Sequence, residues 1–372
     1  MDALCGTHVE FRISETPVFL PKPLVHEIEK AGSEIIMQLM SNTRYLELSE
    51  RVLPNEFNVP NQTDHPLFAA VDFGITKVEN GEDVPRLIEL QGFPTMFMYQ
   101  SALCQQYKEV YDLPRELTSY LSGLSAESYV ELLRTMILGS HDPENVILME
   151  LDPDLQKTRV DFILTERATG IRTVNIRDVV KQGKKLFYRQ NGHLVPIHRI
   201  YNRTIADDLR RSGAKLLFSF RDELEVEWAG HPNWFFRISK FSMPFLNHSS
   251  APRTYFLSDL QSLPDNLEQW VLKPLYSFAG SGVKVGPTRS DIDAISDKER
   301  ENFILQEKVE YAEVVRSPYG GTKIEVRMMY FWPDHRPIAV NTLIRMGRGK
   351  MMGVDHNKDM LWVGSSAGFY LP

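Results

Sequence analysis

Residues 270–285 of the chain read WVLKPLYSFAGSGVKV, and this stretch decides the fold. An apolar run ends at Lys273, a loop of small residues follows, and a second strand-like run covers residues 283–285. The pattern predicts a β-hairpin with a flexible loop. Glycines let backbone N–H groups approach phosphate oxygens, and a lysine at the root of the loop adds a positive charge. Such a hairpin also occurs in proteins that bind no ligand, so its meaning depends on the rest of the chain.

Length and composition limit the class of protein. The 372 residues suffice for two or three domains, and 42 % hydrophobic with 24 % charged residues is typical of soluble globular chains. A net charge of -7 argues against a general nucleic-acid-binding role. Two cysteines, Cys5 and Cys104, exclude a disulfide framework and a cysteine-rich zinc site. Residues 1–10 show no leader pattern, and no apolar run approaches the roughly 20 residues that span a bilayer. We therefore expect a cytoplasmic protein with neither nucleic-acid nor membrane partners.

Two apolar, strand-like runs each contain a carboxylate: Asp72 lies within AVDFGI and Glu89 within LIELQGFP. Glu89 and Gln91 share one face of their strand, because side chains two apart point the same way. Buried carboxylates are costly unless a cation or a basic side chain compensates them. One hypothesis is that a polar turn brings Asp72, Glu89 and Gln91 together as oxygen ligands of Mg²⁺. The alternative is that each acid meets an arginine or lysine, such as Arg86.

Three further strand-like runs carry polar groups. The run FILQEKV, residues 303–309, can offer backbone groups at its edge to an adenine, or be a plain strand with a solvated end. The runs KIEVRMMY and NTLIRMGR alternate charged or polar with apolar residues and contain Arg327 and Arg345. These arginines could stabilise charge on a transferred phosphoryl group, or lie on the surface of a strand.

The middle of the chain reads as a small α/β domain. A strand at residues 146–149, a helix over 155–168 that ends at Gly170, and a strand at 172–176 form a β-α-β pattern, which predicts a mainly parallel sheet. Downstream, Arg203 could bind the carboxylate of a substrate, since arginine forms bidentate pairs with carboxylates. The alternative is that this segment caps a short helix.

Together these segments resemble the ATP-grasp superfamily of carboxylate–amine ligases. Residues 271–285 are similar to the lysine strand and glycine loop of that family, residues 303–309 to its adenine-binding hinge, and residues 324–330 to its Glu-x-Arg strand. Asp72 with Glu89 and Gln91 resembles the magnesium motif, which usually has Asn where Gln91 stands. This motif comes last in the common order and first here, so the chain resembles the circularly permuted, glutathionylspermidine-synthase-like members.

The resemblance implies an α/β (α+β) fold: a circularly permuted ATP-grasp with a small Rossmann-like pre-grasp domain. Residues 1–115 would carry the Mg²⁺-binding strands, 116–240 the pre-grasp domain, and 241–372 the lysine strand, glycine loop and hinge. Mg²⁺ would be held by Asp72, Glu89 and Gln91. The implied catalytic residues are Arg345, Arg327 and Lys273. The residues implied to bind ATP are Lys240, Lys273, Ser277, Phe278, Ala279, Gly280, Ser281, Gly282, Gln306, Glu307, Lys308 and Val309.

The implied reaction joins a carboxylate to an amine through an acyl phosphate and releases ADP and phosphate. Small molecules and peptides are both open as substrates, and a homodimer is the default expectation for an enzyme of this size. The alternative is a catalytically degenerate scaffold that binds nucleotide or a protein partner, which the glutamine at position 91 favours.

Overall fold

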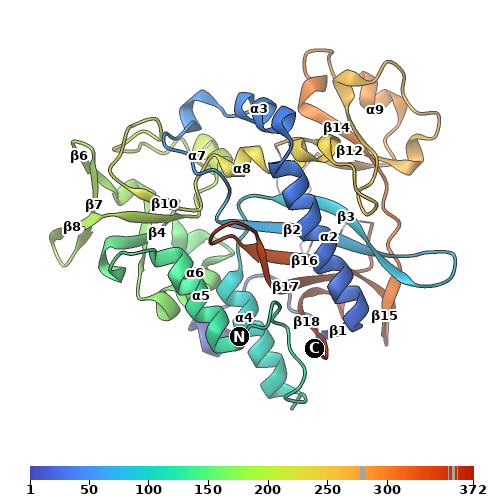
Figure 1. Ribbon diagram of the computed structural model, residues 1–372, viewed down its shortest axis with the longest axis horizontal. Coiled ribbons are helices and arrows are strands. Elements are labelled where there is room, and N and C mark those ends of the chain that lie inside the picture. Colours follow the sequence, from blue (N-terminus) through green and yellow to red (C-terminus); the bar gives the residue numbers. More distant parts are fainter. Residues whose placement is uncertain (277–281, 351, 354–356, 358) are drawn as a thin grey trace.

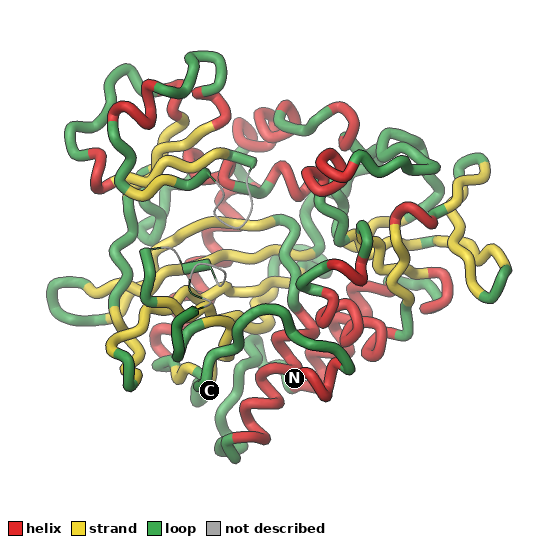
Figure 2. The backbone as a smooth tube through the Cα atoms, turned by 180° about the vertical axis from the view of Figure 1, so that it is seen from behind, coloured by secondary structure: helices red, strands yellow, loops and turns green. Residues whose placement is uncertain are grey.

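The computed structural model describes residues 1–276, 282–350, 352–353, 357 and 359–372. Within these residues the largest element is a seven-stranded sheet in the order β1-β18-β17-β16-β2-β3, with β15 also paired to β16 (Figures 1 and 2). The strands are β1 (Val18–Phe19), β2 (Phe68–Lys77), β3 (Asp83–Gln91), β15 (Glu313–Ser317), β16 (Gly320–Phe331), β17 (Ile338–Gly347) and β18 (Gly364–Phe369). The predicted hairpin β2–β3 is confirmed, and its strand β2 pairs with β16, about 250 residues further along the chain.

The two faces of this central sheet follow from strand alternation. Val71 and Phe73 of β2 and Val326 of β16 pack under helix α2 (Lys22–Met40), which crosses the sheet in Figure 1. The residues between them, Asp72 and Arg327, therefore lie on the opposite face. Strands β2 and β16 thus bury apolar side chains beneath α2, and their other face carries Asp72 and Arg327 beside apolar residues such as Phe68 and Met329.

Helix α2 lies so close to the sheet that a side chain at Gly32 would displace its neighbour. A Cβ added at Gly32 would stand 2.2 Å from the hydroxyl oxygen of Tyr330, whose ring is fully buried and whose O–H donates to the carbonyl of Glu29 (3.0 Å). Gly32→Ala is therefore expected to lower the free energy of unfolding by about 1–3 kcal/mol. This reverses the roughly 1 kcal/mol that alanine normally contributes to a helix. Urea unfolding of Gly32→Ala beside Ser33→Ala checks it; a more stable Gly32→Ala variant would contradict the close packing.

The middle of the chain forms a second sheet, in which every pair is parallel, in the order β10-β9-β4-β5. Its strands are β4 (Val146–Glu150), β5 (Arg172–Asn175), β9 (Arg199–Asn202) and β10 (Glu227–Ala229). Helix α6 (Arg159–Thr169) joins β4 to β5 and ends at Gly170, where φ is 80°. The predicted β-α-β unit with parallel strands is therefore confirmed. A small antiparallel sheet of β6 (Val180–Gln182), β7 (Lys185–Gln190) and β8 (His193–Ile197) projects beside it (Figure 1).

A third sheet has the order β11-β14-β12-β13 and contains the hairpin predicted from residues 270–285. Its strands are β11 (Thr254–Phe256), β12 (Trp270–Pro274), β13 (Lys284–Val285) and β14 (Phe303–Glu307). Val271 lies opposite Val285, which confirms the hairpin. Its loop residues Ser277, Phe278, Ala279, Gly280 and Ser281 lie outside the described residues.

The other helices are α1 (Asp2–Cys5), α3 (Thr43–Arg51), α4 (Phe97–Val110), α5 (Ala126–Leu138), α7 (Ala206–Ser212), α8 (Trp234–Arg237) and α9 (Arg289–Asp293). Across the part of the chain that the structure describes, no helix combines the length and apolar character needed to cross a bilayer. Strands from the predicted regions 1–115 and 241–372 share the central sheet, whereas the parallel sheet lies within 116–240.

Candidate functional site

A cleft of about 780 Å³ lies where β3, β16 and β17 of the central sheet face the third sheet. Its lining includes ten of the residues predicted to form the site: Glu89, Gln91, Lys240, Lys273, Gln306, Glu307, Lys308, Val309, Arg327 and Arg345. Two described residues from the prediction, Asp72 and Gly282, do not line it. The fold thus brings together residues from six separate segments of the sequence.

The cleft is positively charged within a negatively charged protein. Its described lining has eight Lys or Arg side chains and five Glu side chains, whereas the whole chain has a net charge of -7. An excess of positive charge in a concave site attracts and retains anions. The electrostatics of the cleft therefore suit a ligand with several negative charges.

Lys273, at the end of β12, is 9 % exposed, and its Nζ donates to the carbonyl of Ile88 (3.2 Å). Burial lowers the pKa of Lys273 to about 8; Glu89 opposes this shift and Lys240 adds to it. Burial also lowers the pKa of Lys240, again opposed by Glu89. An anion that binds beside both lysines would favour their charged forms.

A β-bulge at Ile88 shapes one wall of the cleft. Asp72 pairs with Glu89 but the next residue of β2, Phe73, pairs with Leu87, so Ile88 is an extra residue in β3. Its carbonyl accepts from Lys273 and, at 3.4 Å, from Nε2 of Gln306. Bulges commonly re-aim side chains beside functional sites. Here the bulge lets Glu89 line the cleft while Leu87 packs in the core beneath α2.

Asp72 is the centre of a buried ionic network. Its side chain has no exposure, and Nε and Nη2 of Arg327 donate to its two oxygens, each at 2.7 Å. Arg345 also donates to Asp72 and to Glu325, which accepts a further hydrogen bond from Tyr311 (2.7 Å). Burial alone would raise the pKa of Asp72, but the two guanidinium groups outweigh it and hold that pKa below its ordinary value. These arginines explain why a carboxylate can be buried here.

The alternative that a basic side chain compensates the buried acid therefore holds for Asp72. Its partners are the two arginines just described and not Arg86, which donates to the carbonyl of Ser249 (2.6 Å). Of the predicted metal ligands, Glu89 and Gln91 line the cleft, and Nε2 of Gln91 donates to Glu89 (2.8 Å). Among the described residues, no three or more His, Cys, Asp or Glu side chains are grouped to hold a metal ion.

In the predicted hinge, at the end of β14, some polar groups have hydrogen-bond partners and others do not. The N–H groups of Glu307 and Lys308 already donate to the carbonyls of Arg253 and Gln269, both at 2.8 Å. The carboxylate of Glu307 forms an ion pair with Arg253 (2.9 Å). In contrast, Oε1 of Gln306 is buried without a hydrogen-bond partner in the described structure. A ligand that donates a hydrogen bond could satisfy this oxygen.

Arg203 also lines the cleft, together with Phe93 and Thr95. It is 6 % exposed, its guanidinium lies 4.4 Å from the centre of the Phe93 ring, and Nη1 donates to the carbonyl of Pro94 (2.8 Å). Its Nε is buried and has no partner among the described residues. Arg203 is therefore a fixed cation with hydrogen-bonding capacity left for a carboxylate.

The helix-cap alternative for this segment is wrong. Helix α7 has Ile205 at its N-cap position, and no side chain caps it. Asn202 accepts from the backbone N–H of Thr204 (3.2 Å), which stabilises a local turn before the helix. The hypothesis that Arg203 binds the carboxylate of a substrate stays a prediction.

Glu150, at the end of β4, gives a testable pH dependence. Burial raises its pKa from 4.5 to about 8, opposed by the N–H of Leu151 and by Arg203. Between these values the native state holds a proton that the unfolded chain releases, so stability falls as pH rises through this window. We expect the wild-type protein to lose about 1–3 kcal/mol from pH 5 to 9 relative to Glu150→Gln. Urea unfolding at both pH values checks this, with the exposed Glu144→Gln as control; parallel curves for wild type and Glu150→Gln would contradict it.

Three features of the site had no role in the sequence prediction. Glu325 is the glutamate of the Glu-x-Arg strand, and a role for its carboxylate could have been found, because it lies two residues before Arg327 and so shares a strand face with it. Tyr311 lies in an irregular segment with no periodicity, and the bulge at Ile88 has no composition signal.

Comparison with known proteins finds a solved structure with a similar fold. No protein-family model matches the chain, and no curated protein sequence matches it. Among solved structures, it is similar to a glutathione synthetase-like effector from Globodera pallida in its apo form. The TM-score is 0.59 at 9 % identity, over 97 % of this chain and 90 % of that chain. The fold is glutathione synthetase-like. At this identity the likeness is one of architecture alone.

Proposed function

We propose that the protein is an ATP-dependent carboxylate–amine ligase of the ATP-grasp type, with the motifs in circularly permuted order. One observation carries the proposal: the lysines, the hinge, the carboxylate strand and the arginines, predicted from separate segments, line one positively charged cleft. The glutathione synthetase-like fold supports it. The pairing of β2–β3 with β16 supports the permuted order, because it joins early and late parts of the chain in one sheet.

The residues of the cleft suit ATP. Lys240 and Lys273 would hold its phosphates, where two cations with burial-lowered pKa values lie together. The purine would lie along the end of β14, where the unpartnered Oε1 of Gln306 can accept a hydrogen bond from an amino group. The volume of about 780 Å³ is that of a typical cofactor site.

Mg²⁺ fits this site less completely. Glu89 and the amide oxygen of Gln91 would hold it, with phosphate oxygens as further ligands, whereas both oxygens of Asp72 already accept from arginines. When bound, the ion would offset negative charge on the phosphates. Arg345, fixed by Asp72 and Glu325, would place a permanent positive charge beside the transferred phosphoryl group.

The acid substrate would lie toward Arg203, whose guanidinium would bind a carboxylate. Attack of a substrate carboxylate on the γ-phosphate gives an acyl phosphate and ADP, and an amine then displaces phosphate to form an amide. The protein need only bind, orient and exclude water, so no nucleophilic side chain is required.

A second candidate is a nucleotide-binding scaffold without ligase activity. The engagement of Asp72 by two arginines and the glutamine at position 91 favour it, because both reduce the oxygen ligands offered to Mg²⁺. Release of ADP and phosphate distinguishes it from the ligase.

Calorimetric titration of ATP, with and without Mg²⁺, tests both candidates. We expect Mg²⁺-dependent binding that weakens at least about tenfold in Lys273→Met, a loss of about 1.4 kcal/mol. The matched control is Lys284→Met, in the same hairpin, where the exposed lysine pairs with Asp291 (2.6 Å). Equal affinity for Lys273→Met and wild type would remove Lys273 from the site, and absence of ATP binding would overturn both candidates.

A further inference from the structure

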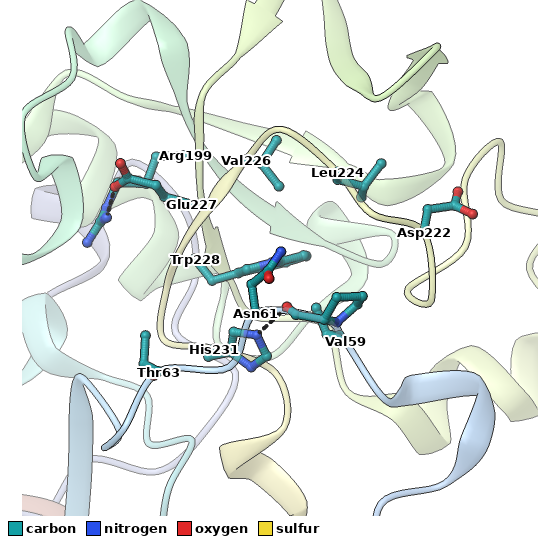
Figure 3. A pocket seen from close by; sticks show the side chains of 11 residues that line it. Val59, Asn61, Thr63, Arg199, Asp222, Leu224, Val226, Glu227, Trp228 and His231 are labelled. Carbon is teal, nitrogen blue, oxygen red and sulfur yellow. Dashed lines mark hydrogen bonds and ion pairs between the residues drawn. The ribbon is translucent and has the colours of Figure 1, made fainter.

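A second cavity, of about 320 Å³, lies beside the edge strand β10 (Figure 3). Its walls are the segment 59–63 and the segment 222–231, with Arg199 at the start of β9. It shares no lining residue with the large cleft. The ligase mechanism leaves this cavity without a role.

The wall formed by segment 59–63 is fixed in place. Asn233 accepts from the N–H of Val59 (3.0 Å) and donates to its carbonyl (3.1 Å). Nε2 of His231 donates to the carbonyl of Pro60 (3.2 Å). Burial lowers the pKa of His231 to about 4, so its ring is neutral at physiological pH. His231 and Asn233 are 1 % and 2 % exposed, so buried side chains hold this wall and the cavity is preformed.

An aromatic surface and apolar side chains make up much of the cavity. Trp228 lines it, with its ring nearly parallel to that of Phe220 (centroids 6.1 Å apart, 26°) and edge-on to that of His231 (6.3 Å, 67°). Val59 and Leu224 add apolar contacts. The Trp228 ring is thus supported from two sides and partly exposed toward the cavity, which suits stacking with a second flat ring.

The charged groups around the cavity are compensated. Arg199 pairs with Glu227, as drawn in Figure 3, and its Nε donates to the carbonyl of Ile137 (3.0 Å). Asp222 pairs with Lys181 (2.5 Å). The cavity therefore offers no excess charge to a ligand. The exposed amide of Asn61, a residue with φ of 60°, supplies a neutral hydrogen-bonding group.

We propose that this cavity binds an uncharged, planar, bicyclic heteroaromatic group stacked on Trp228, with a ring N–H that donates to the amide oxygen of Asn61. The volume is at the lower end of small-ligand sites, which fits two fused rings and little more. Paired charges around the cavity disfavour an anionic relative of the same ring, because it would lose hydration without gaining a partner. The site is independent of the proposed ligase cleft.

Isothermal calorimetry with indole as the probe tests the site. We expect one indole per chain at millimolar or tighter affinity, weakened at least about tenfold in Trp228→Leu, as for loss of a stacking platform. Trp362→Leu, outside the cavity, is the matched control. Asn61→Gly, which retains the positive φ, should weaken indole binding but leave binding of 1-methylindole, which lacks the N–H, unchanged. Indole-3-acetate, an anion, should bind more weakly than indole.

Thermal unfolding of each variant separates loss of the site from loss of the fold. Saturable indole binding to the wild-type protein, without saturable binding to a folded Trp228→Leu variant, would support the proposal. Equal indole affinity in those two proteins, or no binding to wild type at millimolar indole, would overturn it. Lys273→Met should bind indole as wild type does; loss of binding there would place the probe in the large cleft and also overturn the proposal.

Discussion

Replacing Asp72 with alanine is expected to lower the free energy of unfolding by about 3–5 kcal/mol, the usual cost of removing one partner from a buried ion pair. Asp72 has no exposure, and its removal would leave the buried guanidinium groups of Arg327 and Arg345 without their shared carboxylate. Urea unfolding measures the loss. Asp83→Ala is the control, because its ion pair with Lys77 (2.7 Å) lies at the exposed end of the same hairpin and should contribute at most about 1 kcal/mol.

This experiment also separates the two roles considered for Asp72. If Asp72 only bound Mg²⁺, its replacement by alanine would remove a buried carboxylate that has no counter-ion in the metal-free protein. The variant would then be as stable as wild type or more so. A structural ion pair predicts the large loss. A change as small as that of Asp83→Ala would contradict the ionic network as the reason for the burial of Asp72.

Replacing Glu89 with glutamine is expected to reduce Mg²⁺-dependent turnover by about 100-fold or more, as for removal of one group that stabilises developing charge. Glu89 is only partly buried, and its side chain accepts a hydrogen bond from the amide of Gln91, so the fold should persist. The measurement is ADP release, together with calorimetry of ATP with and without Mg²⁺. The control is Glu82→Gln, in the exposed turn of the same hairpin.

The calorimetry keeps this prediction testable if the protein is a scaffold without turnover. In that case Glu89→Gln should still abolish the increase in ATP affinity that Mg²⁺ produces. If the variant responds to Mg²⁺ as wild type does, Glu89 does not contact the ion, and the remaining carboxylates of the cleft would have to be tested.

Local patterns in the sequence were sufficient to predict the elements that carry the site. Apolar alternation predicts β2 and β3, and the lysine at the root of a small-residue loop predicts the β12–β13 hairpin. The first signal lies within residues 68–91 and the second within residues 270–285. The parallel β4–α6–β5 unit is predicted for the same reason, because each element has its own period and Gly170 marks a helix end.

What the sequence could not decide is which residue meets which across the central sheet. Burial of Asp72 requires a positive partner, but alternation does not distinguish a metal ion from an arginine. The decisive partners, Arg327 and Arg345, lie 255 and 273 residues away and reach Asp72 only through the register of β2, β16 and β17. The bulge at Ile88 is likewise a property of pairing between strands.

The pairing of β2 with β16 has a consequence for synthesis of the chain. At 5–20 residues per second, a ribosome needs roughly 13–50 seconds to add the 255 residues between Asp72 and Arg327. During that interval the β2–β3 hairpin has an open edge and a carboxylate without its counter-ions, so the central sheet can close only after β16 and β17 have been synthesised. Such non-local pairing slows folding relative to chains built from local contacts.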